Sequence, residues 1–330
     1  MAETRPLSTE DLVDICARAF PDRAGQTIVE VLPIKSRQHQ MTSFELWWLN
    51  DAGVLKHEDL IVRRYVSTLS WWRPDDRGKA QREATVCRWL IAQDFPVPKV
   101  YVREFGPQGD VVLFSRLPHD GPALTGRTLK QAVEPHITQF ARLLAQLHSL
   151  TPPDPVRQVV PKVTLPGAAA NLVSLAFQIG LPELHTSVQQ VMQHAFQVQE
   201  LSPVLLHGDY HFLNALLHDN KISGIIDWEY SAIGDPRWDV ANAYMQLVDF
   251  GAAEAADKFL ATYLHYSGLE FEGPPLYNVI TPLQQWAISE WLVQVEAKGE
   301  LPGFALAQDL VASRDIHRNR AMKAMQWLDQ

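Results

Sequence analysis

The fold can be predicted from one stretch of sequence, His207-Gly208-Asp209-Tyr210-His211-Phe212-Leu213-Asn214. A short apolar run, residues 204–206, precedes it, and a second such run, residues 222–226, ends at Asp227. Short apolar runs separated by polar turns are typical of small β-structures. This segment is therefore predicted to place two carboxylates and one amide at the ends of neighbouring strands.

These three polar side chains suit phosphoryl transfer. That reaction passes through a loose transition state and asks little covalent chemistry of the protein. It needs a base aimed at the acceptor hydroxyl and oxygen ligands that hold Mg²⁺ on the phosphates. Asp209 can supply the base, while Asn214 and Asp227 can supply the two hard ligands.

Three segments resemble the signature blocks of the aminoglycoside phosphotransferase and choline kinase-like superfamily, and they occur in the family's order. They are residues 207–214, 226–229 and 234–241. Eukaryotic protein kinases match less well, because they carry Arg at the position of Gly208 and Phe-Gly at the position of Trp228-Glu229.

The resemblance implies a bilobal protein-kinase-like fold and a kinase of small molecules that uses Mg²⁺ and ATP. It implies that Asp209 is the catalytic base and that Asn214 and Asp227 bind magnesium. It also implies two supporting residues, His207 within the first block and Asp239, which braces the catalytic loop from the following helix.

The rest of the chain predicts an α+β fold with two lobes. Residues 1–117 are expected to form an N-terminal nucleotide-binding lobe that opens with a helix, and residues 118–330 a mainly helical catalytic and substrate-binding lobe. β-prone runs cover residues 27–34, 42–49, 60–65 and 111–117. Helical spacing covers residues 12–20, 78–92, 137–150, 172–179, 184–198, 240–248, 252–266, 283–295 and 316–328, and the Pro-rich residues 151–166 are expected to form a surface loop.

The first lobe is expected to supply a cation for the nucleotide phosphates, held by an acid on its inserted helix. Arg63 lies on the strand where the family that the sequence resembles carries its phosphate-binding Lys or Arg. Glu83 shares a helical stripe with Ala80, Ala84 and Cys87, so it should point inward, where an unpaired carboxylate is costly. We expect Arg63 and Glu83 to meet; the alternatives are a solvated Arg63 and a Glu83 paired with Lys79.

The loop predicted to cover the ATP phosphates, residues 33–44, contains no glycine. Glycine normally lets backbone N–H groups approach phosphate closely. We expect Ser36, Ser43 or Lys35 to take this role, or nucleotide binding to be weak. By analogy with the family, the segment between the lobes runs from Phe114 to Leu117, and its backbone would hold adenine. Both ATP and GTP remain open as donors.

Composition and charge exclude several classes of partner. The formal net charge is −9 and hydrophobic residues make up 46% of the chain. Nucleic-acid binding normally needs a clustered basic surface, so no nucleic-acid partner is expected. No run has the length of a signal peptide or a membrane span, so no membrane partner and a cytoplasmic location are expected. The two cysteines, Cys16 and Cys87, are expected to be structural thiols, and the oligomeric state is left open.

Two other functions stay open from the sequence. His207, Asp209 and His211 alternate in a pattern that could bind a transition metal, as in a metal-dependent hydrolase. The glycine-free loop also fits a catalytically weak kinase-like protein that binds nucleotide without turnover.

The acceptor is expected to be a small molecule with a hydroxyl group, such as an antibiotic, an amino sugar, a sugar or a choline-like amine. Trp286, Glu290, Trp291 and Glu296 could form an aromatic, acidic wall for a cation. The same spacing is more typical of core packing on a helix.

Overall fold

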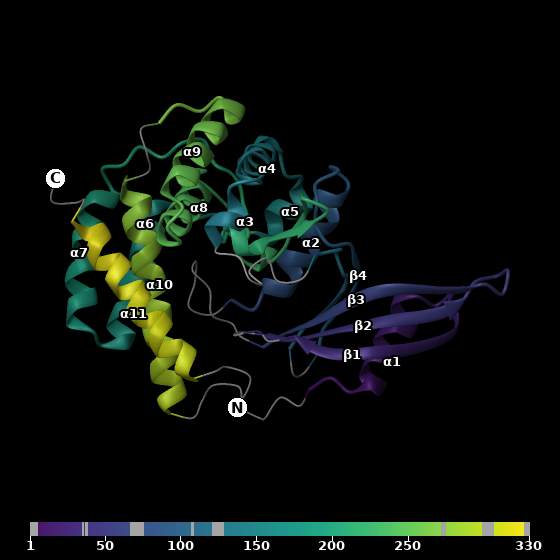
Figure 1. The fold of residues 1–330 in the computed structure, drawn as a ribbon. Helices are drawn as coiled ribbons and strands as arrows, with labels where there is room; N and C mark the ends of the chain where they lie inside the picture. The colour runs from purple at the N-terminus through teal and green to yellow at the C-terminus, as the bar shows by residue number, and fades with distance from the viewer. Residues whose placement is uncertain are drawn as a thin grey trace.

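The computed structural model describes residues 6–34, 36, 39–66, 76–106, 109–120, 129–271, 275–298 and 307–326. A β-sheet forms from the N-terminal part of the chain, and a mainly helical region forms from the rest (Figure 1). The predicted α+β fold is therefore confirmed. The division of the chain after residue 117 stays a prediction.

Five antiparallel strands make the sheet in the order β1-β2-β3-β5-β4. Strands β2 and β3 pair without a shift from His39 opposite Tyr65 to Leu49 opposite Leu55. The side chain of Asn50 closes the turn between them by accepting hydrogen bonds from two backbone N–H groups. The strands are β1 (Ala24–Ile34), β2 (His39–Leu49), β3 (Leu55–Tyr65), β4 (Val100–Glu104) and β5 (Val111–Ser115).

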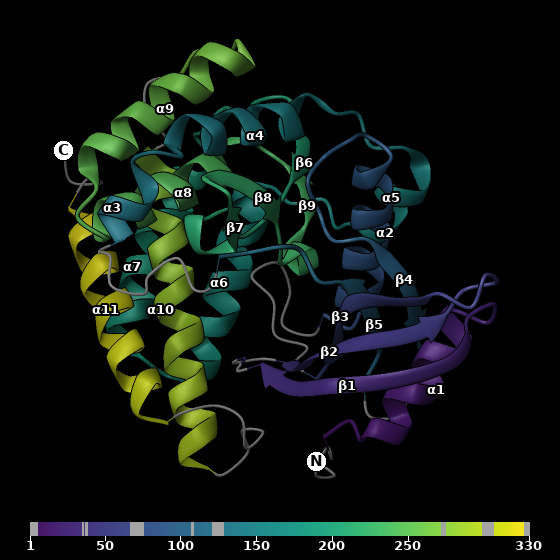
Figure 2. The same ribbon diagram turned by 45° about the vertical axis from the view of Figure 1, so that its right-hand side comes forward.

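Two helices cover opposite faces of this sheet (Figure 2). Because side chains alternate along a strand, Leu60 and Val62 face α1 (Thr9–Ala19), where Leu12 and Cys16 complete one core. Val112 and Phe114 belong to a second core that includes Ala84 and Cys87 of α2 (Lys79–Ile91). Arg63 lies next to Val62 on β3, so its side chain leaves the sheet on the α2 side.

Helices make up most of the chain beyond residue 128. They are α3 (Leu129–Val133), α4 (Ile137–Ser149), α5 (Asp154–Val159), α6 (Leu165–Ile179), α7 (Pro182–Ala195), α8 (Arg237–Asp249), α9 (Ala253–Ser267), α10 (Pro275–Ala297) and α11 (Ala307–Met325). Among the helices in the part of the chain that the structure describes, none is both long and apolar enough to cross a membrane.

Three predictions for segments that contain prolines need correction, and α11 begins at Ala307 rather than at residue 316. Residues 151–166 do not form a simple surface loop, because α5 lies there with Val156 buried. Helix α6 begins at Leu165 rather than at residue 172, with Pro166 in its first turn, where proline costs no hydrogen bond. Helix α10 begins at Pro275 rather than at residue 283, and it continues through Pro282.

A small β-structure interrupts the helices, as the sequence predicts. Strand β6 (Val204–Leu206) pairs with β9 (Ala232–Gly234), and β7 (Ala215–His218) forms a hairpin with β8 (Lys221–Ile225). Two single-turn helices, η1 (Phe212–Asn214) and η2 (Trp228–Tyr230), connect them. The loop after β6 and the loop after β8 carry the residues of the candidate active site.

Candidate active site

Asp239 of α8 fixes the loop between β6 and η1 by hydrogen bonds to its backbone. The Asp239 carboxylate accepts hydrogen bonds from the backbone N–H groups of His207, at 2.7 Å, and Gly208, at 2.9 Å. Gly208 has a φ of 84°, and a Cβ there would lie 2.1 Å from the Tyr230 carbonyl oxygen. A side chain such as the arginine of protein kinases would therefore not fit at this position.

Asp209 follows directly and keeps 17% of its side chain exposed, so it can meet a substrate. The Asn242 side-chain N–H donates to its Oδ1 at 3.2 Å, and His211 Nε2 lies 3.4 Å from its Oδ2. Burial alone would raise the pKa of Asp209, but the charge and hydrogen bond of His211, together with the Asn242 hydrogen bond, hold that pKa below its ordinary value. The carboxylate is thus ionised at neutral pH.

Asn214 and Asp227 lie at the same end of the β7–β8 hairpin. The Ile226 N–H, one residue before Asp227, donates to the Asn214 carbonyl at 2.9 Å. The Asn214 side-chain amide donates to the Asp209 carbonyl at 3.0 Å, which leaves its Oδ1 as the atom available to a ligand. An amide oxygen beside an incompletely buried carboxylate is a donor set that fits Mg²⁺.

Arg63 and Glu83 come together, 3.1 Å apart between Nη1 and Oε2. The same guanidinium nitrogen lies 2.7 Å from Asp227 Oδ1, so Arg63 joins the sheet to the loop after β8. Glu83 also accepts a short hydrogen bond from the Tyr65 hydroxyl and one from the Trp228 N–H at 3.3 Å. Burial, which Arg63 only partly offsets, and the nearby acids raise the pKa of Glu83 to about 7. The expected alternative, a Glu83 paired with Lys79, is not formed.

Sequence reasoning missed Glu229, which is 2% exposed. Its carboxylate lies 3.2 Å from Arg63 Nη2, 3.7 Å from Lys79 Nζ and 2.5 Å from His39 Nε2. Burial alone would raise the pKa of Glu229, but these three partners hold it well below its usual range. No local sequence signal shows this, because the partners come from β2, β3 and α2.

His39 is the neutral member of this group. Its Nδ1 accepts a hydrogen bond from the Val66 N–H at 3.3 Å, which leaves Nε2 to carry the proton toward Glu229. Burial, partly offset by Glu229, lowers the pKa of His39 to about 4. The imidazole therefore joins the start of β2 to η2 without adding a charge.

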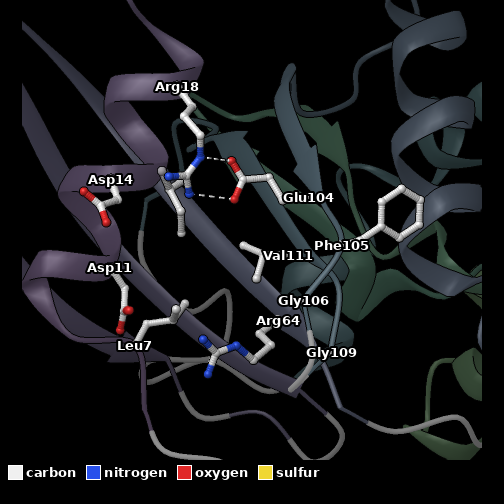
Figure 3. A pocket seen from close by; sticks show the side chains of 11 residues that line it. Leu7, Asp11, Asp14, Arg18, Arg64, Glu104, Phe105, Gly106, Gly109 and Val111 are labelled. Atoms are coloured by element: carbon white, nitrogen blue, oxygen red, sulfur yellow. Dashed lines mark hydrogen bonds and ion pairs between the residues drawn. The ribbon is translucent and has the colours of Figure 1, made fainter.

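Arg64, which follows Arg63 on β3, lies on the other face of the sheet. It lines a hollow of about 750 Å³, including space open to solvent, between α1 and the segment joining β4 to β5. Figure 3 shows Arg18 of α1 and Glu104 of β4 facing each other there, joined by hydrogen bonds of 2.6 and 2.8 Å. None of the described residues predicted to handle phosphate, metal or proton lines this hollow, so it is separate from the candidate active site.

The remaining predicted nucleotide contacts lie around the sheet. Ser43 is buried within β2, and its hydroxyl donates to the Leu32 carbonyl at 3.4 Å. Phe114 is buried on β5, and Leu117 packs against Gly224 of β8, where a Cβ would meet its side chain at 2.2 Å. The roles of these residues in binding nucleotide stay predictions. Lys35 lies outside the described residues.

The alternating histidines do not form a transition-metal site. His207 is fully buried, with Nδ1 accepting from the Asp209 N–H at 3.2 Å and Nε2 donating to the Ile226 carbonyl at 2.9 Å. Both ring nitrogens are therefore used within the protein, and neither can ligate a metal. The metal-dependent hydrolase alternative therefore lacks His207, the first of its three expected metal ligands.

The aromatic, acidic wall is also not formed. Trp286 is 1% exposed and packs in a helical core with Leu283 and Ala287, as the core-packing alternative predicts. Glu290 lies 3.8 Å from Arg314 of α11.

Comparisons with known proteins agree with this geometry. A family model described as the phosphotransferase enzyme family matches residues 40–277. A search of curated protein sequences found no match.

Similar solved structures share the fold at low sequence identity. A Ralstonia eutropha protein provisionally named an aminoglycoside phosphotransferase aligns with a TM-score of 0.69 and 15% identity over 98% of each chain. A thermostable variant of aminoglycoside phosphotransferase APH(4)-Ia, in ternary complex with ADP and hygromycin B, aligns at 0.62 and 15% over 95% of this chain and 97% of that one. Spectinomycin phosphotransferase APH(9)-Ia aligns at 0.60 and 12% over 98% and 100%. Because the family model spans most of the chain, including Arg63, Asp209 and Asp227, the chain belongs to the phosphotransferase enzyme family.

Proposed function

We propose that this protein transfers the γ-phosphoryl group of Mg-ATP to a hydroxyl group of a small molecule, with Asp209 as the base. One observation carries the proposal: an ionised, partly exposed carboxylate stands on a loop fixed by Asp239, beside the oxygen ligands of Asn214 and Asp227. Family membership supports the reaction class. Such a site provides the base and the ligands that phosphoryl transfer requires.

In the proposed reaction, Asn214 and Asp227 would hold magnesium, which would neutralise charge on the phosphates. Arg63 would leave Asp227 and present its guanidinium to the phosphates while Glu83 and Glu229 keep it in place. Asp209 accepts the proton of the acceptor hydroxyl. The hydroxyl oxygen forms the new bond to the γ-phosphorus, the bond from that phosphorus to the β,γ-bridging oxygen breaks, and ADP leaves with the electron pair.

The choice of donor rests on the similar structures, some of which hold ADP or an ATP analogue, whereas another holds GDP. We propose ATP as the donor and the cytoplasm, where ATP is available, as the location. The names of these structures mention hygromycin B, spectinomycin and kanamycin, but at identities of 12 to 18% the likeness shows the fold alone.

Two measurements test the proposal. One is calorimetric titration of the purified chain with ATP, with and without Mg²⁺, and the other is ADP release in the presence of hydroxyl-bearing acceptors. Magnesium-dependent ATP binding and acceptor-dependent ADP release are expected, and a parallel GTP titration compares the donors. ATP binding without any turnover would favour the catalytically weak alternative. No nucleotide binding at all would refute both.

A further inference from the structure

A recess opens directly beside Asp209, between the catalytic loop and helices α8 and α10. Its empty volume is about 320 Å³, including space open to solvent. The residues that line it, here called the acceptor recess, are Gly208, Asp209, Trp238, Asn242, Thr281, Gln284 and Gln285. Apart from Asp209, none of these described residues is ionisable.

Two residues of α10 that line this recess carry polar atoms without a hydrogen-bond partner. Gln284 is 6% exposed, and its Nε2 is buried without a hydrogen-bond partner. The buried Thr281 hydroxyl likewise has no partner. A buried amide or hydroxyl without a partner costs free energy, so such groups are normally satisfied by water or a ligand. Their position next to Asp209 indicates a ligand whose own groups are hydrogen-bond donors and acceptors.

A chain of amides continues from this ligand position to the base. The Gln285 side-chain N–H donates to Asn242 Oδ1 at 3.5 Å, and the Asn242 side-chain N–H donates to Asp209 Oδ1 at 3.2 Å. This arrangement fixes Oδ1 of Asp209. The proton of the acceptor would then go to Oδ2, which lies 3.4 Å from His211 Nε2. The groups that hold Asp209 here are the neutral amides of Asn242 and Gln285, whereas a site for ammonium groups would need carboxylates.

The acids of α10 lie elsewhere. Glu290 is directed toward Arg314 on α11, and no described glutamate or aspartate other than Asp209 lines the recess. An ammonium group held by Gln284, Thr281 and Gln285 would lose hydration without meeting a carboxylate among these three side chains, which is costly. A hydroxyl group both donates and accepts, as the amides and the threonine require.

We propose that the acceptor is an uncharged, polyhydroxylated molecule, a neutral sugar or polyol, rather than a polycationic amino sugar or a quaternary amine. Gln284, Thr281 and Gln285 bind its non-reacting hydroxyls and present one hydroxyl to Asp209. The transfer is the one described above: the proton goes to Asp209, the phosphoryl group to the hydroxyl oxygen, and ADP leaves. The inference rests on the proposed kinase function.

The test compares acceptors that differ only in an amine. ADP release from Mg-ATP is measured with glucose against glucosamine and galactose against galactosamine, below the pKa of the amines, and with kanamycin and choline. The neutral member of each pair is expected to have the higher kcat/KM by roughly tenfold or more, because the amine has no partner in the recess. A preference for the amines, for kanamycin or for choline overturns the inference, and so does a lack of turnover with every neutral acceptor.

Two variants connect this preference to the recess. Gln284→Glu, which adds a carboxylate of nearly the same shape, should shift the preference toward the amine member of each pair by roughly tenfold. Gln284→Leu should raise KM for the neutral acceptor and leave KM for ATP unchanged. Gln146→Glu adds the same charge on an exposed position of α4 and should change neither. If Gln284→Glu and Gln146→Glu behave alike, Gln284 does not bind the acceptor and the inference fails.

A Mg-ATP titration of the wild type and of each variant distinguishes failure of the proposed kinase function from failure of the inference about the acceptor. If the wild-type chain does not bind Mg-ATP, the proposed function fails and the inference falls with it. If it binds Mg-ATP and phosphorylates amines in preference to neutral sugars, the proposed function stands and the inference alone is wrong.

Discussion

Arg63 Nη1 lies 2.7 Å from Asp227 Oδ1, so the cation expected to bind phosphate is paired with the acid expected to bind magnesium. Arg63 is also in contact with Glu83 and Glu229, which stay in place if Asp227 is withdrawn. If the proposed roles hold, magnesium would compete with a guanidinium for Asp227, and a phosphate group would replace Asp227 as a partner of Arg63. Such an exchange would link metal binding to phosphate binding.

Asp227→Asn should weaken magnesium-dependent ATP binding by roughly 10- to 100-fold, because it removes the anionic oxygen ligand. ATP binding without magnesium should change much less. Calorimetric titrations of wild type and variant, each with and without Mg²⁺, measure both effects. An unchanged magnesium dependence would exclude Asp227 as a ligand.

Arg63→Ala and Glu83→Ala should each raise KM for ATP or lower turnover, and their effects should not be additive. The two groups contact each other, so the double variant should lose less than the sum of the single losses by about 1 kcal/mol or more. A double-mutant cycle on kcat/KM for ATP measures this coupling. Strict additivity would show that the two residues act independently.

Glu229→Ala should destabilise the fold strongly, because it leaves Arg63 and Lys79 as buried cations with fewer partners. Breaking a buried ion pair costs about 3 to 5 kcal/mol. Urea unfolding measures the loss, and Glu254→Ala, at an exposed position of α9, should stay within about 0.5 kcal/mol of wild type. Equal effects of the two substitutions would contradict the buried network.

His211→Gln should move the acidic limb of the pH–rate profile to higher pH. Asp209 acts as a base only when ionised, and the His211 charge helps to hold its pKa below the ordinary value. The reverse effect of Asp209 outweighs burial and raises the pKa of His211, which favours that charge near neutral pH. Without His211 the pKa of Asp209 rises, so activity is lost earlier on acidification. His265→Gln, at an exposed position of α9, should leave the profile unchanged, and a shift in the opposite direction would refute the assignment.

Much of the candidate site could be predicted because its parts are local in sequence. Asp209, Asn214 and Asp227 lie within one small β-structure, and short spacings fix which end of a strand each occupies. The meeting of Arg63 and Glu83 could be expected because Arg63 lies at the family's position for a phosphate-binding cation and Glu83 lies on an inward helical stripe. These patterns depend on a few neighbouring residues and not on the whole fold.

The residues that were missed depend on packing between distant elements. Lys79 stands at the start of α2, where lysine is usually solvated, yet it is 1% exposed because η2 packs against that helix. Glu229 has no pattern that separates it from a surface acid. The sequence did not predict a helical position for Thr281, because the helix was expected to begin only after Pro282.

The central claim is that Asp209 removes the proton of the acceptor, and Asp209→Asn tests it most directly. Single-turnover transfer of the γ-phosphoryl group from Mg-ATP to the best acceptor of the panel is measured beside the affinity for Mg-ATP, with the exposed Asp219→Asn as the matched control. The account predicts a loss of about 10²-fold or more in the transfer rate for Asp209→Asn, with ATP affinity within about twofold of wild type and no loss in the control. Retention of more than about a tenth of the rate would contradict it.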